Sequence, residues 1–264
     1  MFLCLMSWIT NYTNLVPIIN LRFTKHSRFF PIIRLDFGYD EDSQKTPLTH
    51  AVFKGNLKSV EALLKSGADA NQEDDSGFTP LFQAMVLSDV EMITVLSRHG
   101  ANLNLDITHG LKPIILAIGT ENIEVLESLI ENGANINFGD NGWSPITMAI
   151  SKNNMKIVQL LITNGANVNQ RGLGKLPLLM AVESGNKDMV KLLVENGATL
   201  NVHEANGATP LHVAIFMKHV EIIKYFIDVG ADLQFRTKNF KINSIELALH
   251  CKEIPALKTL CYNQ

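Results

Sequence analysis

The chain has 264 residues with a formal net charge of −3; 46% of its residues are hydrophobic and only 19% are charged. This balance, with a sequence pI near 6.2, excludes the strongly basic character of a typical nucleic-acid binder, so no nucleic-acid partner is expected. Cys4, Cys251 and Cys261 have no metal-ligand spacing, which argues against a disulfide framework or zinc site and favours an intracellular, cytoplasmic setting.

Residues 1–40 differ in composition from the rest of the chain. Residues 1–35 contain four basic side chains and no acidic one, with large apolar side chains spread throughout. The apolar stretch 2–9 has no positive charge ahead of it, unlike a secretory signal, and only two serines are present, fewer than an organelle presequence would carry. Three interpretations remain: a targeting segment, a translated leader with no fold of its own, and a cap on the domain that follows. We favour the cap, formed by apolar residues between Phe29 and Phe37.

From residue 44 onward, two short markers recur with one common period. A proline, usually after Thr or Ser, recurs at intervals of 33, 33, 32, 32 and 33 residues, at Pro47, Pro80, Pro113, Pro145, Pro177 and Pro210. A Gly-Ala pair keeps the same period, at Gly67, Gly100, Gly133, Gly165, Gly197 and Gly230. A degenerate seventh copy begins at Asn243-Ser244. Two markers that share a period indicate tandem structural repeats.

Each repeat predicts two helices and a connector. A Thr or Ser before the proline can cap the first helix, and proline suits the first helical position because no amide donor is needed there. A small residue is expected where the first helices approach one another, at Ala51, Ala84, Ala117, Ala149, Ala181, Ala214 and Ala248. The second helix carries a larger apolar stripe and ends at the Gly of the Gly-Ala pair, through a positive φ. An asparagine then opens the connector and is expected to hydrogen-bond its own turn, at Asn71, Asn104, Asn137, Asn169 and Asn201.

The stretch Thr209-Pro210-Leu211-His212-Val213-Ala214 carries the T-P-L-H-x-A signature, and with the period of about 33 residues the sequence resembles the ankyrin repeat family. The resemblance implies an all-α fold, an ankyrin-repeat solenoid of helix-turn-helix units with short β-hairpin-like fingers. It divides the chain into a non-repeat segment, 1–40, and a repeat domain, 41–264. The repeats are expected at 44–72, 77–105, 110–138, 142–170, 174–202, 207–235 and 241–264, the seventh acting as the C-terminal cap.

Two repeats depart from the pattern at the helix start. Lys112 and Leu176 replace the capping Thr, which removes roughly 1 kcal/mol of helix stabilisation per site. Repeats three and five are therefore predicted to fray more readily. The histidine of the signature survives only as His212.

No catalytic constellation is recognisable, so the chain is not expected to be an enzyme or to hold a cofactor or metal ion. The nucleotide, hydrolase and zinc-protease motifs are absent from the sequence. Gly172-Leu173-Gly174 is attributed to a repeat connector, since no strand precedes it. Hydroxylation of the connector asparagines is a modification that the family resemblance implies.

The sequence gives a clearer indication of a surface that binds a partner protein. In ankyrin proteins partners usually contact the finger tips and the exposed side of the first helix, a concave surface. The matching positions here are unusually apolar and predict a partner-binding strip across repeats one to four, at Phe53, Phe78, Val86, Leu87, Leu111 and Trp143. A weaker second patch is expected at Phe216 and Met217, with Phe235, Phe240 and Ile242 nearby. Two alternatives remain: residues 1–40 cover the strip, or its side chains turn into the core.

The sequence therefore predicts a monomeric, non-catalytic scaffold or adaptor that binds a partner protein. One alternative is a membrane-peripheral protein anchored by residues 1–35, although no apolar run reaches the roughly 18 residues needed to span a bilayer. Another is an effector that an intracellular bacterium or virus places in the host cell.

Overall fold

The computed structural model describes residues 45–106, 111–139, 142–202, 208–237 and 241–251. Backbone contacts divide the chain into two units, Met1–Glu41 and Asp42–Gln264, and every described residue belongs to the second. The cap and the membrane anchor predicted for the first 40 residues lie outside the described part of the chain.

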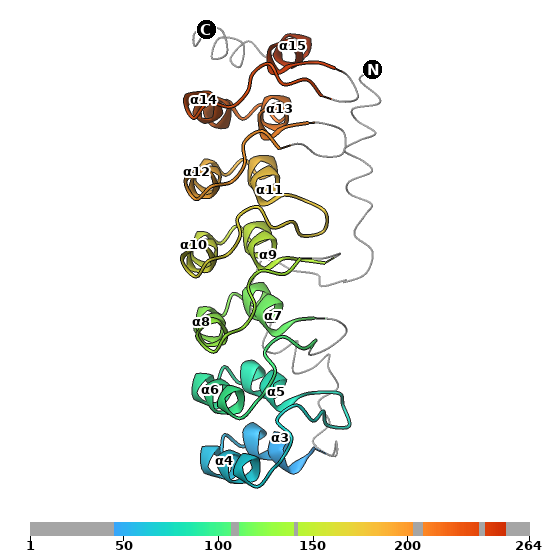
Figure 1. Cartoon of the computed structure of the whole chain (residues 1–264), viewed down its shortest axis with the longest axis vertical. Helices are drawn as coiled ribbons and strands as arrows, with labels where there is room; N and C mark the ends of the chain where they lie inside the picture. The colour runs from blue at the N-terminus through green and yellow to red at the C-terminus, as the bar shows by residue number, and fades with distance from the viewer. Residues whose placement is uncertain (1–44, 107–110, 140–141, 203–207, 238–240, 252–264) are drawn as a thin grey trace. The chain divides into compact units, whose positions relative to one another are not determined.

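The described residues form helices in pairs, which alternate between two rows (Figure 1). The first helices of the repeats form one row: α3 (Pro47–Phe53), α5 (Pro80–Val86), α7 (Pro113–Gly119), α9 (Pro145–Ser151), α11 (Pro177–Glu183), α13 (Pro210–Phe216) and α15 (Ser244–His250). The second helices form the other row: α4 (Leu57–Lys65), α6 (Val90–Arg98), α8 (Ile123–Glu131), α10 (Met155–Thr163), α12 (Lys187–Glu195) and α14 (Val220–Asp228). Within these residues the fold is helical and without a sheet, so the predicted all-α solenoid is confirmed.

The first helices begin where the sequence predicts. The hydroxyl oxygens of Thr46, Thr79, Ser144 and Thr209 accept hydrogen bonds from backbone N–H groups in the first turn, and a proline follows each of them. Lys112 and Leu176 provide no side-chain cap, as expected.

The second helices have caps of their own, which the sequence analysis did not single out. Five begin with an Asn or Asp whose side-chain oxygen accepts an N–H from the first turn, namely Asn56, Asp89, Asn122, Asn154 and Asn186. His219 stands at this position in α14 and makes no such bond. Each second helix then ends at the glycine of the Gly-Ala pair, whose φ of about 82 to 92° is the predicted left-handed conformation.

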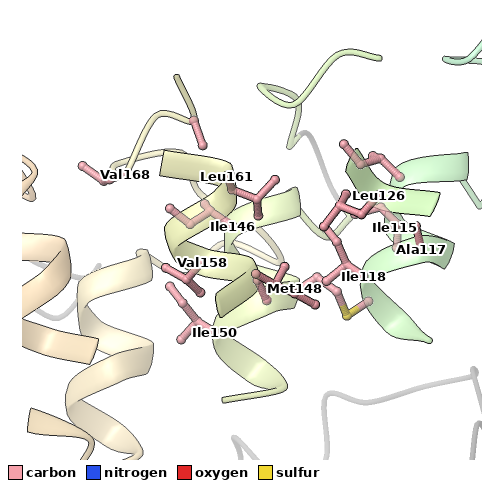
Figure 2. Close-up of a cluster of buried hydrophobic side chains, with 14 of the residues drawn as sticks. Ile115, Ala117, Ile118, Leu126, Ile146, Met148, Ile150, Val158, Leu161 and Val168 are labelled. Carbon is pink, nitrogen blue, oxygen red and sulfur yellow. The ribbon is translucent and has the colours of Figure 1, made fainter. Parts of the chain in front are cut away.

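The core runs continuously between the helical pairs. Figure 2 shows its centre, where Ile118 of α7 and Leu126 of α8 face Ile146 and Met148 of α9 and Leu161 of α10. All seven alanines predicted at the first-helix contact are buried. The helices whose backbones approach closely belong to the same repeat or to adjacent repeats, as expected for a solenoid.

The connector asparagines behave differently from the prediction. Asn137 does not close its own turn; its Oδ1 accepts the N–H of Asn167 at 2.7 Å, and its Nδ2 donates to the Gly165 carbonyl at 2.9 Å, both in the next repeat. Its own turn is closed by Asn135, whose Oδ1 accepts the N–H of Asn137 at 2.8 Å. Two asparagines two residues apart thus have separate roles. Asn135 closes the turn, and Asn137 joins neighbouring repeats through its two side-chain hydrogen bonds, an arrangement called the asparagine clamp below.

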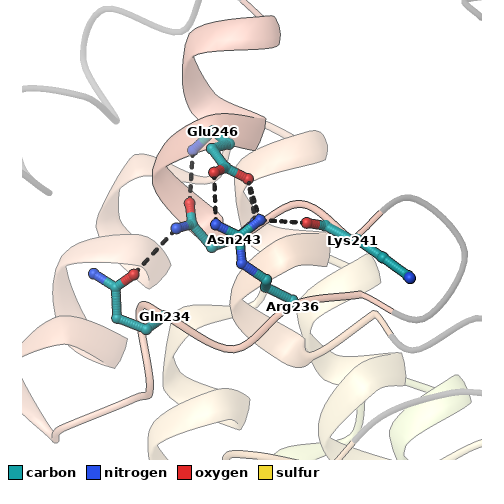
Figure 3. Close-up of polar contacts among 5 residues, drawn as sticks. All are labelled: Gln234, Arg236, Lys241, Asn243 and Glu246. Carbon is teal, nitrogen blue, oxygen red and sulfur yellow. Dashed lines mark hydrogen bonds and ion pairs between the residues drawn. The ribbon is translucent and has the colours of Figure 1, made fainter.

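The seventh repeat replaces Thr-Pro with a polar network (Figure 3). Asn243 Oδ1 accepts the N–H of Glu246 at 2.9 Å, and Glu246 Oε2 accepts the N–H of Asn243 at 3.0 Å, which forms a capping box. Arg236 pairs with both oxygens of Glu246, at 2.9 and 3.0 Å, and also donates to the Lys241 carbonyl. The backbone N–H of Asn243 first, and then Arg236, lower the pKa of Glu246. The network ties the last connector to the start of α15.

Candidate protein-binding face

The connectors extend from the row of first helices, on the side away from the second helices (Figure 1). The first helices, their C-terminal residues and the connectors therefore share one face of the repeat domain. The sequence predicts the binding strip on this face. The side chains of the strip differ in the fraction of their surface that is exposed to solvent.

Phe78 is not on the surface, which corrects the expectation that it faces water. Its side chain is only 5% exposed, and its ring stacks on that of Phe82, with centroids 4.7 Å apart. Phe82 is itself buried, at the place that Thr holds in repeats one and four and His in repeat six. The two stacked rings belong to one repeat, which the positional comparison of single residues could not reveal.

The other residues of the strip are at least partly accessible. Leu87, at the C-terminal end of α5, is 42% exposed, whereas Val86 beside it is half-buried. Leu111 and Trp143 are half-buried and pack partly against the core. Phe53 is half-buried, and the Nζ atom of Lys45 lies 4.0 Å from the centre of its ring.

In the second patch, Met217 is 41% exposed at the C-terminal end of α13, and Phe216 is half-buried. Phe235 and Ile242 are also half-buried. Phe240 lies outside the described residues.

Two exposed leucines of the connectors were missed as binding residues. Leu105 is 46% exposed and Leu173 is 51% exposed. Leu173 and Gly174 have φ angles of 51° and 75° between the bridged residues Gly172 and Lys175, which is the backbone of a tight hairpin turn. The available signal was the stretch Gly-Leu-Gly, which places an apolar residue at the tip of a turn.

Two hydrogen bonds stabilise the turn at Leu173. The N–H of Leu173 donates to the carbonyl of Gly142 in the preceding connector at 2.7 Å, and Arg171 Nη1 donates to the Gly174 carbonyl at 2.7 Å. A Cβ atom on Gly172 would lie 2.0 Å from Thr147 Oγ1, so only glycine fits there. Leu173 is thus presented on a well-supported backbone.

Charged side chains on this face pair locally. Lys175 Nζ lies 2.8 Å from Glu183 Oε2, and Lys112 Nζ lies 3.2 Å from Asp106 Oδ1. Burial is the main cause that lowers the pKa of Lys152, and Glu121 opposes it. Across the described ranges, no three His, Cys, Asp or Glu side chains gather closely enough to hold a metal ion.

None of the helices in the described ranges is both long and apolar enough to cross a lipid bilayer.

Comparison with known proteins identifies the fold family. The family model for ankyrin repeats in three copies matches residues 24–107, 91–172 and 169–237. The chain belongs to the ankyrin repeat family. Ankyrin repeats are generally protein–protein interaction modules, so the paired helices and projecting connectors described above are those of a binding scaffold. A search of curated proteins finds no match to this sequence.

Solved ankyrin repeat domains share the architecture. The ankyrin repeat domain of Bcl-3, titled a unique member of the IkappaB protein family, is 24% identical with a TM-score of 0.73; the match covers 83% of this chain and all of that one. The human ASB11 ankyrin repeat domain is 26% identical with a TM-score of 0.59, over 83% of this chain and 98% of that one. These structures support the fold.

Proposed function

We propose that this ankyrin repeat protein is a non-catalytic adaptor that holds a partner protein on the face formed by its connectors and the ends of its first helices. The observation that supports the proposal is the location of the exposed apolar side chains. Among the described residues, six large hydrophobic side chains are exposed, and five of them lie on connectors or at the C-terminal ends of first helices: Leu87, Leu105, Leu173, Met217 and Leu249. Folding gives no reason to keep leucine at such positions, whereas association buries it.

Leu111 and Trp143 add half-buried apolar surface between these exposed residues along the chain. Trp143 in particular offers a large side chain that a partner could cover further, and tryptophan is enriched among residues that dominate binding energy. Phe78 is left out of the proposed contact because it is buried, and its substitution would test stability instead.

The proposal is tested by capture of the partner from the cells that express the protein, with cross-linking and mass spectrometry. The double variant Leu87→Asn/Leu173→Asn should lose the captured protein by about tenfold or more, because two apolar contacts of roughly 1 kcal/mol or more each are removed. Val229→Asn is the matched control, since Val229 is a similarly exposed residue at the C-terminal end of the second helix α14. Equal loss in the control, or full capture by the double variant, would contradict the proposed face.

We also propose that the protein acts as a monomer in the cytoplasm. The three cysteines, which have no disulfide or metal-ligand pattern, support a reducing intracellular setting. Light scattering coupled to size-exclusion chromatography should give the mass of one chain, and fluorescence imaging of the tagged protein should give a diffuse cytoplasmic signal.

A further inference from the structure

The junction between repeats two and three is packed differently from the other junctions of the domain. Along the row of first helices, neighbouring backbones approach closely at α3–α5, α7–α9, α9–α11, α11–α13 and α13–α15. The pair α5–α7 is the exception. In the other row, α6 and α8 approach more closely than any other neighbouring pair of second helices. The contact at this junction has therefore shifted from the first helices to the second helices.

Side-chain size explains the close approach of α6 and α8. Ser128 of α8 is only 3% exposed and occupies the place that Leu160, Leu192 and Tyr225 hold in later second helices. Asn132 Nδ2 donates to Thr94 Oγ1 across the junction at 3.3 Å and to the Ser128 carbonyl at 2.8 Å. A small residue and a hydrogen bond thus bring the two second helices together.

Side-chain size also explains the weaker contact of α5 with α7. The third residue of a first helix points toward the next repeat, as Thr147 shows by filling the space where a Cβ atom on Gly172 would lie. In α5 this residue is Phe82, the largest side chain at this position in the seven repeats. Because Phe78 stacks on Phe82, the ring cannot move aside freely.

The asparagine clamp is weakened at the same junction. Asn71, Asn137 and Asn169 each make two hydrogen bonds to the following repeat. The side chain of Asn104, which joins repeats two and three, makes only one such bond, from the Asn135 N–H to its Oδ1 at 2.8 Å, while its backbone carbonyl accepts a bond from Lys112 Nζ of repeat three at 3.1 Å. Asn201 also makes a single bond, to Asp232, but there α11 and α13 remain in close contact. Only the junction of repeats two and three combines a single clamp bond with separated first helices.

We propose that this junction is a hinge. Repeats one and two rock as a block against repeats three to seven, with the α6–α8 contact as the pivot and the α5–α7 contact as the part that opens and closes. Such motion changes the spacing of the connectors on either side of the junction, and so adjusts the binding face to its partner. Hinges of this kind arise where few contacts need to break for two rigid blocks to move.

Spin-label distances test the proposal in the absence of any partner. Labels are attached at equivalent positions at the C-terminal ends of the first helices, on the side that is proposed to open, in a background in which the three native cysteines are replaced by serine. One pair, Leu87→Cys with Lys152→Cys, spans the proposed hinge and the next junction; the matched pair, Thr120→Cys with Ser184→Cys, spans the next two junctions. The distance distribution of the first pair should be about 1.5-fold broader or more. Equal widths would overturn the hinge.

Hydrogen exchange gives a second, independent measurement. α7 and α11 both lack a side-chain cap, but only α7 has lost the close contact with its preceding first helix. The amides of α7 should therefore exchange about tenfold faster than those of α11. Equal exchange would show that the missing cap alone controls these helices and would contradict the hinge.

A substitution in α8 tests whether the α6–α8 contact is the pivot. Ser128→Leu restores the leucine found in α10 and α12, and should lengthen the distance between second-helix labels at Glu91→Cys and Lys156→Cys, while the distance between labels at Glu124→Cys and Asp188→Cys stays the same. A circular dichroism spectrum confirms that the variant is folded. An unchanged Glu91–Lys156 distance in a folded variant would exclude α6–α8 as the pivot.

Discussion

Individual residues at the same place in successive repeats differ widely in exposure. The residue before each first-helix cap is half-buried at Leu111 and Trp143 but buried at Phe78. Phe78 also differs in its neighbour, since its ring stacks on that of Phe82 in the same repeat. Position in the repeat therefore predicts the backbone environment of a residue, while its exposure depends on which side chains surround it.

Leu173 is predicted to be unfavourable for folding. Its φ of 51° lies in the left-handed region, where a branched apolar residue is strained and asparagine is tolerated. Leu173→Asn should raise the free energy of unfolding by about 0.5–1 kcal/mol, measured by urea denaturation. Leu105→Asn is the control, because Leu105 is similarly exposed and is not among the described residues with positive φ. A gain of similar size in the control would show that lost apolar exposure, and not the backbone, is responsible.

His212 is predicted to make stability depend on pH. Its ring is buried, and its Nδ1 lies 2.7 Å from Thr209 Oγ1; burial lowers its pKa below the ordinary value of 6.5. Below about pH 6.5 the unfolded chain therefore binds a proton that the folded chain does not, so the free energy of unfolding falls as the pH falls. His212→Thr, which recreates the Ser144–Thr147 type of cap, should show a smaller decrease between pH 7.5 and 5.5 in urea titrations. An identical pH dependence in the two proteins would assign the effect to other groups.

At the scale of the helical element, the residue that precedes a first helix can stabilise it either by capping its N-terminus or by burying an apolar side chain. Lys112 and Leu176 both stand at the start of a first helix and neither caps it. Lys112 is half-buried and pairs with Asp106, whereas Leu176 is only 5% exposed and belongs to the core. The two repeats therefore lack the same hydrogen bond for different reasons, because the leucine side chain contributes packing in place of the cap.

A threonine at these positions should consequently have opposite effects. Lys112→Thr should stabilise the protein by less than about 1 kcal/mol, since the gained cap is partly offset by the loss of the ion pair with Asp106 and of the hydrogen bond to the Asn104 carbonyl. Leu176→Thr should destabilise it by about 1 kcal/mol or more, because the loss of a buried leucine exceeds the gain of a cap. Thermal and urea unfolding of both variants measure the difference. Stabilisation by both would mean that the buried Leu176 contributes little.

At the scale of the whole repeat domain, stability depends on the contacts between neighbouring repeats. Each repeat buries its apolar side chains against the next one, and the connector asparagines add hydrogen bonds at the rim of the same contact. Bonds between repeats are therefore expected to determine how cooperatively the stack unfolds.

Asparagine clamps of different strength should respond differently to removal. Asn137→Ala deletes two hydrogen bonds between repeats and should lower the free energy of unfolding by about 1–2 kcal/mol. Asn104→Ala deletes one and should cost about half as much. Urea denaturation of the two variants measures the ratio. Equal losses would indicate that the asparagines act mainly through their own turns, as the sequence alone suggested.

The periodic sequence allowed the fold to be predicted in detail and the binding face only in outline. Helix starts at Thr46, Thr79, Ser144 and Thr209, helix ends at the Gly-Ala pairs, and the buried alanines follow from local preferences that repeat six or seven times. The burial of Phe78 and the inter-repeat role of Asn137 could not be predicted, because each depends on a side chain or a carbonyl that the fold brings from elsewhere.

By itself the sequence determined the repeat period, the paired helices and the family to which the chain belongs, because caps, glycine stops and apolar periodicity act within a few residues of one another. Tertiary structure decided which apolar side chains remain accessible, that the asparagines join one repeat to the next, and that α5 and α7 are separated while α6 and α8 are close. These features depend on side-chain volumes and hydrogen-bond partners in adjacent repeats, about 30 residues apart in the sequence, and are settled only when the repeats pack together.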